Sequence, residues 1–430
     1  ISTSVGPFVN ANFIMKNRYF VDGSFRRSGS SKFGDKNRFA PFWSVGAGWN
    51  IHNEEFATRF GWLNTFRLRY SYGVTGNVSF APYQAVTTYF YNGENFYLHG
   101  IGAIPKTMGN RDLKWELTKS HNIGLNLDLW DNRINATFDY YVKTTDDVLI
   151  DMSVPPSVGE TTVRNNLGQM RNKGFEFEVT ALLVSTKDWR FSLKVNGDHN
   201  KNEILGISNS LAKYNEEANA NASSAPKVLY KEGESTTAIY AVRSAGINPA
   251  TGEEVFIKRN GAWTLEYDPN DKVVVGDENA WLKGAFFPML SYKGWQLNMA
   301  FEYNFGGQIY NTTRADNVEN VNPRNNVDRR AFEERWKNVN DVPAYLDIAN
   351  ADSRTSYHTS RFVEDDNNVI CRNIELSYDF NQNLLKKIGF KRLRLSLGMK
   401  DPFRMSTVKF ERGTEYPFSR GFTFSISPTF

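Results

Sequence analysis

The stretch LKWELTKSHNIGLNLDLW, residues 113–130, decides which fold to expect. Apolar and polar side chains alternate along it with a period of two, which is the period of a β-strand. At about 18 residues it is roughly three times as long as an ordinary strand. A strand that crosses a bilayer at a tilt needs about 9–11 residues, so the stretch predicts a membrane-crossing strand. The apolar positions are Leu113, Trp115, Leu117, Ile123, Leu125, Leu127 and Leu129.

Composition agrees with this expectation. Aromatic residues make up 14% of the chain, yet the mean hydropathy is −0.51. No run approaches the ~18 apolar residues of a transmembrane helix, whereas a closed β-barrel needs only alternate apolar positions. The near balance of 51 basic and 47 acidic residues favours no nucleic-acid partner. Five His and one Cys argue against a zinc site or a disulfide framework. We therefore predict an all-β, transmembrane antiparallel β-barrel without a cofactor.

The same alternation recurs along the chain, for example in RINATFDYYVK at 133–143. Short polar links alternate with long loops, which we expect at 77–112, 201–281 and 310–365. Outer-membrane barrels have short periplasmic turns and long extracellular loops, so the long loops are expected outside the cell. The expected strands lie near 7–16, 18–30, 39–51, 64–77, 113–130, 132–149, 171–184, 188–200, 282–292, 295–309, 366–380, 391–402 and 419–430.

Strand parity adds a further expectation. About thirteen strands are counted, and the first runs from the outside toward the turn at Lys16 and Asn17. A complete bacterial barrel has an even number of strands and begins in the periplasm. We therefore expect residues 1–430 to be the C-terminal part of a larger barrel domain, lacking both a signal peptide and the first strands. In the last strand, GFTFSISPTF at 421–430, the apolar side chains are expected to face lipid.

Several stretches resemble the SusC/RagA family of TonB-dependent outer-membrane transporters. WLNTFRLRYSYGVTGN at 62–77 is the most specific, and the resemblance extends over nearly the whole chain. It implies a 22-stranded barrel of which this chain supplies about 13 strands, with the N-terminal plug domain absent. The other stretches are RYFVDGSFRRSGSSKFGDKNRFAPFWSVGAGWNI at 18–51, 113–150, NNLGQMRNKGFEFEVTA at 165–181, GINPATGEEVFI at 246–257 and RFVEDDNNVICRNIELSYDF at 361–380.

The resemblance also implies a function and partners. It implies nutrient import across the outer membrane of a Gram-negative bacterium, with oligosaccharides or peptides as substrate. A SusD-like surface lipoprotein would form a lid, the TonB complex would act through the missing plug, and outer-membrane lipid or lipopolysaccharide would surround the barrel. The terminal Phe430 resembles the C-terminal aromatic signal for barrel assembly. A passive porin or a surface adhesin is the alternative; no catalytic constellation occurs, so no enzyme is expected.

Two sets of residues are candidates for contact with substrate. Aromatic faces stack on sugar rings and line peptide grooves, and a cluster of them lies in TTYFYNGENFYLHG at 87–100; packing within the loop or against the lid is the alternative. Charged residues of the lumen face could hold substrate or the plug, or could simply be solvated. The aromatic candidates are Tyr89, Phe90, Tyr91, Phe96 and Tyr97, and the lumen candidates are Asp139, Glu176, Glu178, Lys194 and Glu302.

Four further features give weaker expectations. DPNDKVVVGDEN at 268–279 is rich in acids but lacks the glycine of a calcium loop, so Asp268, Asp271 and Asp277 are only weak metal candidates and a plain acidic loop is favoured. Residues 326–341 predict a short amphipathic helix within a loop, and loop architecture is favoured over contact with the lipoprotein. Cys371 is expected on the lumen face together with Asn373. The expected aromatic girdle at the membrane interface consists of Trp49, Trp130, Trp189 and Trp295.

Overall fold

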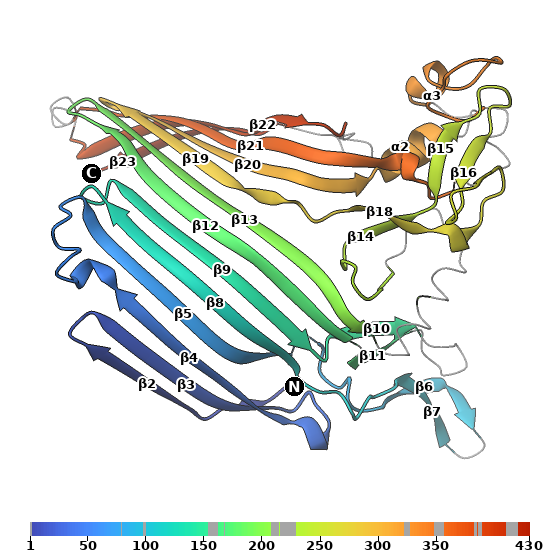
Figure 1. The fold of residues 1–430 in the computed structure, drawn as a ribbon, viewed down its shortest axis with the longest axis horizontal. Coiled ribbons are helices and arrows are strands. Elements are labelled where there is room, and N and C mark those ends of the chain that lie inside the picture. Colours follow the sequence, from blue (N-terminus) through green and yellow to red (C-terminus); the bar gives the residue numbers. More distant parts are fainter. Residues whose placement is uncertain are drawn as a thin grey trace. The chain divides into compact units, whose positions relative to one another are not determined.

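The computed structural model describes residues 2–78, 80–97, 100–153, 162–166, 168–207, 215, 229–321, 327–347, 357–381, 385, 389–409 and 420–430. Within them, long strands form one 14-stranded sheet (Figure 1). The strand order is β1-β3-β4-β5-β8-β9-β12-β13-β19-β20-β21-β22-β23, and β2 also pairs with β3. Sequence neighbours are thus sheet neighbours, and the recorded pairs are antiparallel. An all-β antiparallel fold is confirmed.

All thirteen expected strands are present. The sheet comprises β1 (Ser4–Val5), β2 (Phe8–Met15), β3 (Tyr19–Ser30), β4 (Phe39–Asn50), β5 (Leu63–Asn77), β8 (Glu116–Leu129), β9 (Ile134–Asp146), β12 (Gly168–Ser185), β13 (Trp189–Ile207), β19 (Leu282–Tyr292), β20 (Trp295–Tyr310), β21 (Val363–Asp379), β22 (Arg392–Ser406) and β23 (Phe422–Thr429). Tight turns connect several of them because their residues accept positive φ. Lys16 and Asn17, with φ of 52° and 55°, are the two central residues of a β-turn that the Arg18 N–H closes by donating to the Met15 carbonyl. Positive φ at both central positions matches the twist of the flanking strands.

Short elements that the alternation did not predict lie between the long strands. Small sheets are formed by β6 with β7, β10 with β11, β14 with β18, and β15 with β16 and β17. Their bounds are β6 (Thr88–Tyr97), β7 (Gly100–Thr107), β10 (Leu149–Ser153), β11 (Thr162–Asn166), β14 (Ala238–Ala241), β15 (Arg243–Ile247), β16 (Glu254–Ile257), β17 (Trp263–Thr264) and β18 (Val273–Asp277). The helical pieces are η1 (Asp35–Asn37), η2 (Ile51–Asn53), η4 (Pro269–Asp271), α2 (Thr312–Arg314), the π-helix η5 (Ala315–Glu319), α3 (Arg330–Glu333) and η7 (Ser360–Phe362). No helix in the described ranges has the length and apolarity needed to span a membrane.

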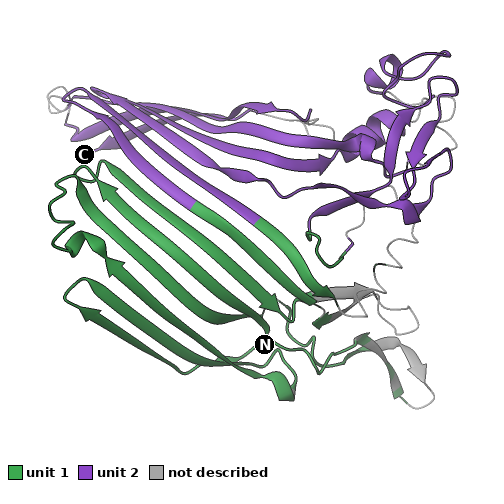
Figure 2. Ribbon diagram, in the orientation of Figure 1, with its two compact units in different colours: residues 1–176, 201–216, 230–236 green, residues 177–200, 217–229, 237–430 purple. Residues whose placement is uncertain are grey.

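The chain divides into two compact units (Figure 2). Unit 1 comprises 1–176, 201–216 and 230–236, and unit 2 comprises 177–200, 217–229 and 237–430. In each unit the buried apolar cluster lies among the links between strands and the strand ends next to them. The cluster of unit 1 contains Phe33, Ala40, Phe80, Ala85, Leu113 and Trp115, and that of unit 2 contains Ile239, Tyr310, Ala315, Val318, Val321, Ala331, Tyr345 and Phe362.

The strands of unit 1 segregate apolar from polar side chains. Directly opposite residues share a face, so the register defines an apolar face that includes the row Val21, Ala47, Tyr70, Ile123 and Tyr140. Val21, Tyr70, Ile123 and Tyr140 are between 42 and 49% exposed. Large apolar side chains exposed in a continuous band mark a surface that meets something other than water. The next row of this face, toward the short turns, is Tyr19, Trp49, Leu68, Leu125 and Phe138.

Unit 2 shows the same segregation. Phe286 pairs with Phe301, and their rings stack 4.6 Å apart. Two residues after Phe301 in β20, Tyr303 extends over Gly284 and Gly197, which are in register with it on the next two strands. Its hydroxyl donates to the Asn196 carbonyl. A Cβ on Gly284 would stand 2.8 Å from the Tyr303 hydroxyl, so glycine is needed there for this crossing. In the last strand the apolar positions Phe422, Phe424 and Ile426 pair with Met399, Leu397 and Leu395.

A β-bulge overturns the expected placement of Cys371. The register of β21 against β20 shifts between Cys371 and Asn373, so Arg372 is an extra residue that reverses the alternation. Cys371 pairs with Phe301 and Phe403 and is fully buried. The prediction that it shares a face with Asn373 is therefore wrong. Cys371 lies on the apolar face.

The expected amphipathic helix at 326–341 is also largely wrong. Only the single turn α3 forms in the described part, and Phe332 is 49% exposed. A turn follows instead, in which the Asp341 carboxylate accepts hydrogen bonds from the backbone N–H groups of Lys337 and Asn338. Local side-chain acceptors of this kind compete with helix formation. The indole N–H of Trp336 donates to the Pro249 carbonyl.

Candidate functional site

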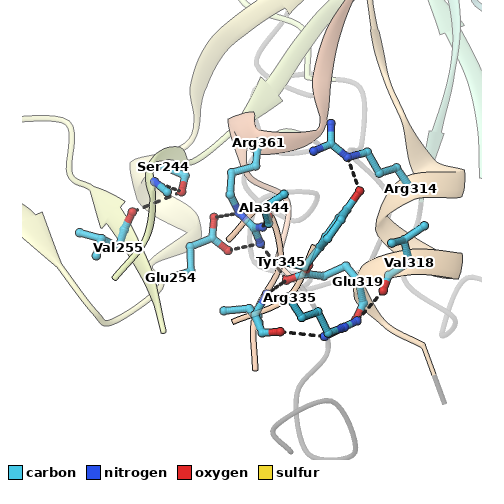
Figure 3. A network of polar contacts seen from close by, with 12 residues as sticks. Ser244, Glu254, Val255, Arg314, Val318, Glu319, Arg335, Ala344, Tyr345 and Arg361 are labelled. Atoms are coloured by element: carbon cyan, nitrogen blue, oxygen red, sulfur yellow. Dashed lines mark hydrogen bonds and ion pairs between the residues drawn. The ribbon is translucent and has the colours of Figure 1, made fainter. Parts of the chain in front are cut away.

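A buried charged network organises the links of unit 2 (Figure 3). We use the name loop layer for residues 238–277, 311–321, 327–347 and 357–364. At its centre Arg361, in η7, binds Glu254 of β16 through two hydrogen bonds of 2.8 and 2.9 Å. It also donates to Glu319 of η5 at 2.9 Å and to the Ala344 carbonyl. Arg361 therefore joins four separate segments of the chain.

Burial makes these contacts necessary. The side chains of Arg361, Glu254 and Glu319 are 10%, 5% and 1% exposed. A buried charge is costly unless it is paired and hydrogen-bonded. Desolvation opposes the charged form of Arg361, but the two carboxylates outweigh it and raise the pKa of the guanidinium above its ordinary value. The network consequently holds only while all its segments are in place.

A second buried arginine closes the end of the π-helix η5. Arg335 is 4% exposed, and its guanidinium donates to the carbonyls of Val318, Glu319 and Leu346. Unsatisfied carbonyls at a helix C-terminus favour a cation there. Burial lowers the pKa of Arg335, in the direction opposite to the change at Arg361. Carbonyl oxygens, more than carboxylates, hold Arg335 in place.

Tyr345 connects this network to the end of the sheet. Arg314 donates to the Tyr345 hydroxyl at 2.7 Å and to Glu364 at 2.6 Å, at the start of β21. Desolvation raises the pKa of the Tyr345 phenol, which stays neutral and able to accept this bond. The loop layer is thus fixed to β20 and β21 by paired charges and by the apolar cluster around Tyr310 and Phe362.

The loop layer exposes both apolar and polar surface. Trp263, Leu265 and Val342 are 73%, 52% and 97% exposed. Val342 also lines a polar cavity of about 560 Å³, whose charged lining includes Glu334, Arg335, Lys337 and Asp341. Exposed aromatic and aliphatic side chains on a rigid support are typical of protein–protein contact sites. Trp263, Leu265 and Val342 were not candidates on sequence grounds.

The aromatic candidates lie on the hairpin of β6 and β7 in unit 1. Tyr89, Phe90 and Tyr91 are 58%, 53% and 72% exposed. Phe96 and Tyr97 belong to β6, but their side chains lie outside what the structure describes. Contact between these aromatics and a substrate stays a prediction.

Most of the charged lumen candidates are paired. The Asp139 carboxylate accepts from Arg69 across Gly124, the residue in register between them. A Cβ on Gly124 would come within 2.5 Å of both groups, so the glycine makes room for the ion pair. Glu178 binds Lys194 at 2.9 Å, Glu302 binds Arg372 at 2.7 Å, and Glu176 is exposed. Their role toward the lumen stays a prediction.

The three weak metal candidates serve local turns. Asp268 accepts from the Asn270 N–H and caps η4, Asp271 accepts from the Arg259 N–H, and Asp277 accepts from Thr237 and from the Asn279 N–H. Among the described residues, no three His, Cys, Asp or Glu side chains gather as a metal site would require.

The aromatic residues expected at the membrane interface lie at the short-turn ends of their strands. Trp130 directly follows β8, whereas Trp189 and Trp295 begin β13 and β20; each is between 45 and 51% exposed. Trp49 stacks on Tyr19 and donates to Glu54. At the other chain end, Phe430 lies 5.0 Å from the ring of Phe390. Contact of the four tryptophans with the membrane interface stays a prediction, as does the role of Phe430 as a signal for barrel assembly.

Known proteins are similar to this chain in sequence and in fold. The family model "TonB dependent receptor-like, beta-barrel" matches residues 2–321. TonB-dependent receptor P39 of Formosa agariphila is 28% identical over 94% of this chain and 42% of its own length. TonB-dependent receptor SusC of Bacteroides thetaiotaomicron is 26% identical over 95% of this chain and 41% of its own length. The chain therefore spans less than half the length of these relatives.

Two solved structures of RagAB are also similar to this chain. The RagAB peptide transporter matches with a TM-score of 0.80 and 25% identity over 95% of this chain and 44% of that one. The RagAB peptide importer in its "open-open" state matches with a TM-score of 0.81 and 25% identity, over 100% of this chain and 47% of that one. The resemblance to SusC and RagA proteins is confirmed. Because the family model covers well over half of its residues, the chain belongs to the TonB dependent receptor-like β-barrel family.

Proposed function

We propose that this chain forms wall and outer loops of an outer-membrane importer that takes up oligosaccharides or peptides with energy from the TonB complex. The observation that carries the proposal is the segregation of the sheet into an exposed apolar face and a paired polar face. A barrel wall in a membrane needs this division, with lipid on one side and water on the other. The relatives named as TonB-dependent receptors support energised transport.

The loop layer supports a second part of the proposal, a SusD-like lipoprotein that closes over the long-loop end. A lid that opens and closes needs a rigid base, because ordering flexible loops at each closure would cost binding free energy. The Arg361 network provides that rigidity, and Trp263 and Leu265 provide exposed apolar contact area. Energy coupling would act through a part of the transporter that lies outside these residues. No covalent chemistry is assigned to the chain.

Uptake by cells that make the intact transporter tests the proposal. Labelled oligosaccharides and peptides would be supplied to the parent strain, to a strain without TonB, and to parent cells treated with a protonophore. We expect import of one substrate class in the parent and its loss in both other conditions. Import that persists without TonB would contradict the proposal and favour a passive porin.

Copurification tests the lid. Replacing Trp263 by Ser should lower the amount of surface lipoprotein that purifies with the transporter. Trp130→Ser is the matched control, because Trp130 is also exposed but lies at a short turn. Equal recovery of the lipoprotein with both variants would place the lid elsewhere.

A further inference from the structure

The apolar face of unit 1 changes character along β8. Ile123 belongs to the exposed apolar row already described, whereas the next two positions on the same face are His121 and Lys119. His121 stacks on Tyr72 at 4.3 Å and hydrogen-bonds the Tyr70 hydroxyl, and Lys119 binds Asp146 at 2.8 Å. The face therefore passes from apolar to charged toward the long-loop end of the strand.

The same transition occurs on β12. Phe175 stacks on Phe138 and thus belongs to the apolar face. Successive side chains of a strand alternate between faces, so Lys173 and Arg171 follow on this face toward the beginning of β12. Arg171 binds Glu203 of β13 at 2.8 Å.

The neighbouring strand β13 adds one more cation. Lys201 lies two positions from Glu203, on the same face. Both Lys173 and Lys201 are close enough to Glu203 to act on its charge, and neither has an ion pair or hydrogen bond among the described residues. We call Lys119, Arg171, Lys173 and Lys201 the basic rim. With Asp146 and Glu203 included, this band has a net charge of +2.

This arrangement selects a ligand with two parts. Its anionic part must meet the basic rim, and its apolar part must continue over Phe175 and Ile123. Lysine binds phosphate as a point charge. Lys173 and Lys201 make no ion pair or hydrogen bond within the described part of the chain, so both can bind a phosphate. A phosphorylated, acylated glycolipid has this combination. At the long-loop end, which faces outward if the proposed function holds, the surrounding leaflet consists of such lipid.

We propose that the basic rim binds the phosphates of lipid A in the outer leaflet, whose acyl chains lie along the apolar face. This inference rests on the membrane orientation in the proposed function. It assigns to Lys173 and Lys201 a role in holding lipid at the outside of the barrel wall, distinct from any contact with the imported substrate.

Titration of the intact, detergent-purified protein with bisphosphorylated lipid A, followed by native mass spectrometry, tests the proposal. Each lysine near an anionic lipid contributes a factor of about five in affinity. Lys173→Gln with Lys201→Gln should therefore weaken binding about 25-fold, and Glu203→Gln should strengthen it. The control Lys194→Gln, on the polar face beside Glu178, should leave the affinity within about twofold.

Three results would overturn the proposal: unchanged affinity in the double lysine variant, equal binding of lipid A without phosphates, or displacement of lipid A by equimolar inorganic phosphate. The last would indicate a simple anion site. The lipid measurement does not involve uptake, so the two hypotheses fail separately. Uptake that needs TonB, together with lipid binding that does not depend on the lysines, refutes only the lipid site. Lipid binding that depends on the lysines, together with uptake that persists without TonB, refutes only the importer.

Discussion

Replacing Arg361 by Met should loosen the loop layer far more than the loss of an exposed arginine would. The substitution leaves the Glu254 and Glu319 carboxylates, 5% and 1% exposed, buried without their cation. Removing one partner of a buried pair costs about 3–5 kcal/mol, because the remaining charge stays uncompensated. Since 1.4 kcal/mol is a factor of ten, opening of the layer should become at least about a hundredfold more frequent.

Hydrogen exchange of the intact transporter measures this opening. The backbone amides of Trp336 and Ala344 bond within the layer, to Tyr345 and Glu334, and report on it directly. Arg329→Met is the matched control, because Arg329 makes an exposed pair with Glu333 in α3. Such pairs contribute about 0.3–0.5 kcal/mol, so exchange should rise by no more than about twofold.

A further variant separates charge from packing. Adding Glu254→Gln and Glu319→Gln to Arg361→Met removes the uncompensated charges, so much of the lost protection should return. Protection that stays within threefold of the wild type in Arg361→Met alone would refute the reasoning. The loop layer would then be held by its apolar cluster, without help from the arginine.

Three more predictions concern separate parts of the chain. Gly124→Val should displace the Arg69 guanidinium and lower the unfolding temperature, as heat-dependent electrophoretic mobility would show; an unchanged temperature contradicts this. Backbone N–H donors hold the pKa of Asp341 below its ordinary value, so the turn it caps should be fully stable near neutrality. That stability should be lost as the pH falls below ~4, and the amides that the Asp341 carboxylate binds should then exchange faster. An exchange rate that shows no such change with pH would refute this prediction. Buried Cys371 should resist maleimide until the protein is denatured, whereas Arg372→Cys with Cys371→Ser should react at once; equal rates would refute the bulge.

The long strands were predictable because their signal is local. Alternation between neighbours such as Asn122 and Ile123 is visible in a few residues, and a strand with one face toward lipid must alternate along its length. The error at Cys371 shows the limit of this rule. One extra residue, Arg372, reverses the parity of everything beyond it, and nothing in the adjacent letters marks the bulge.

The loop layer could not be predicted in the same way. Arg361 and Glu254 are 107 positions apart, so their contact depends on the register of the whole sheet. Both residues lie in stretches that carried the family resemblance, but a resemblance does not show which charges are buried together. The pairing of Asp139 with Arg69 across Gly124 likewise depends on three strands in register.

The proposed import requires lipid on one face of this sheet and water on the other, and neighbouring residues of β8 test that directly. Ile123→Cys and Asn122→Cys, each made with Cys371→Ser and carrying an environment-sensitive fluorophore, would be compared in the intact protein reconstituted into vesicles. Spin-labelled lipids should quench the label at 123 and aqueous iodide the label at 122. Quenching of both positions by iodide alone would contradict a membrane-facing apolar face, and with it the assignment of this sheet to a barrel wall.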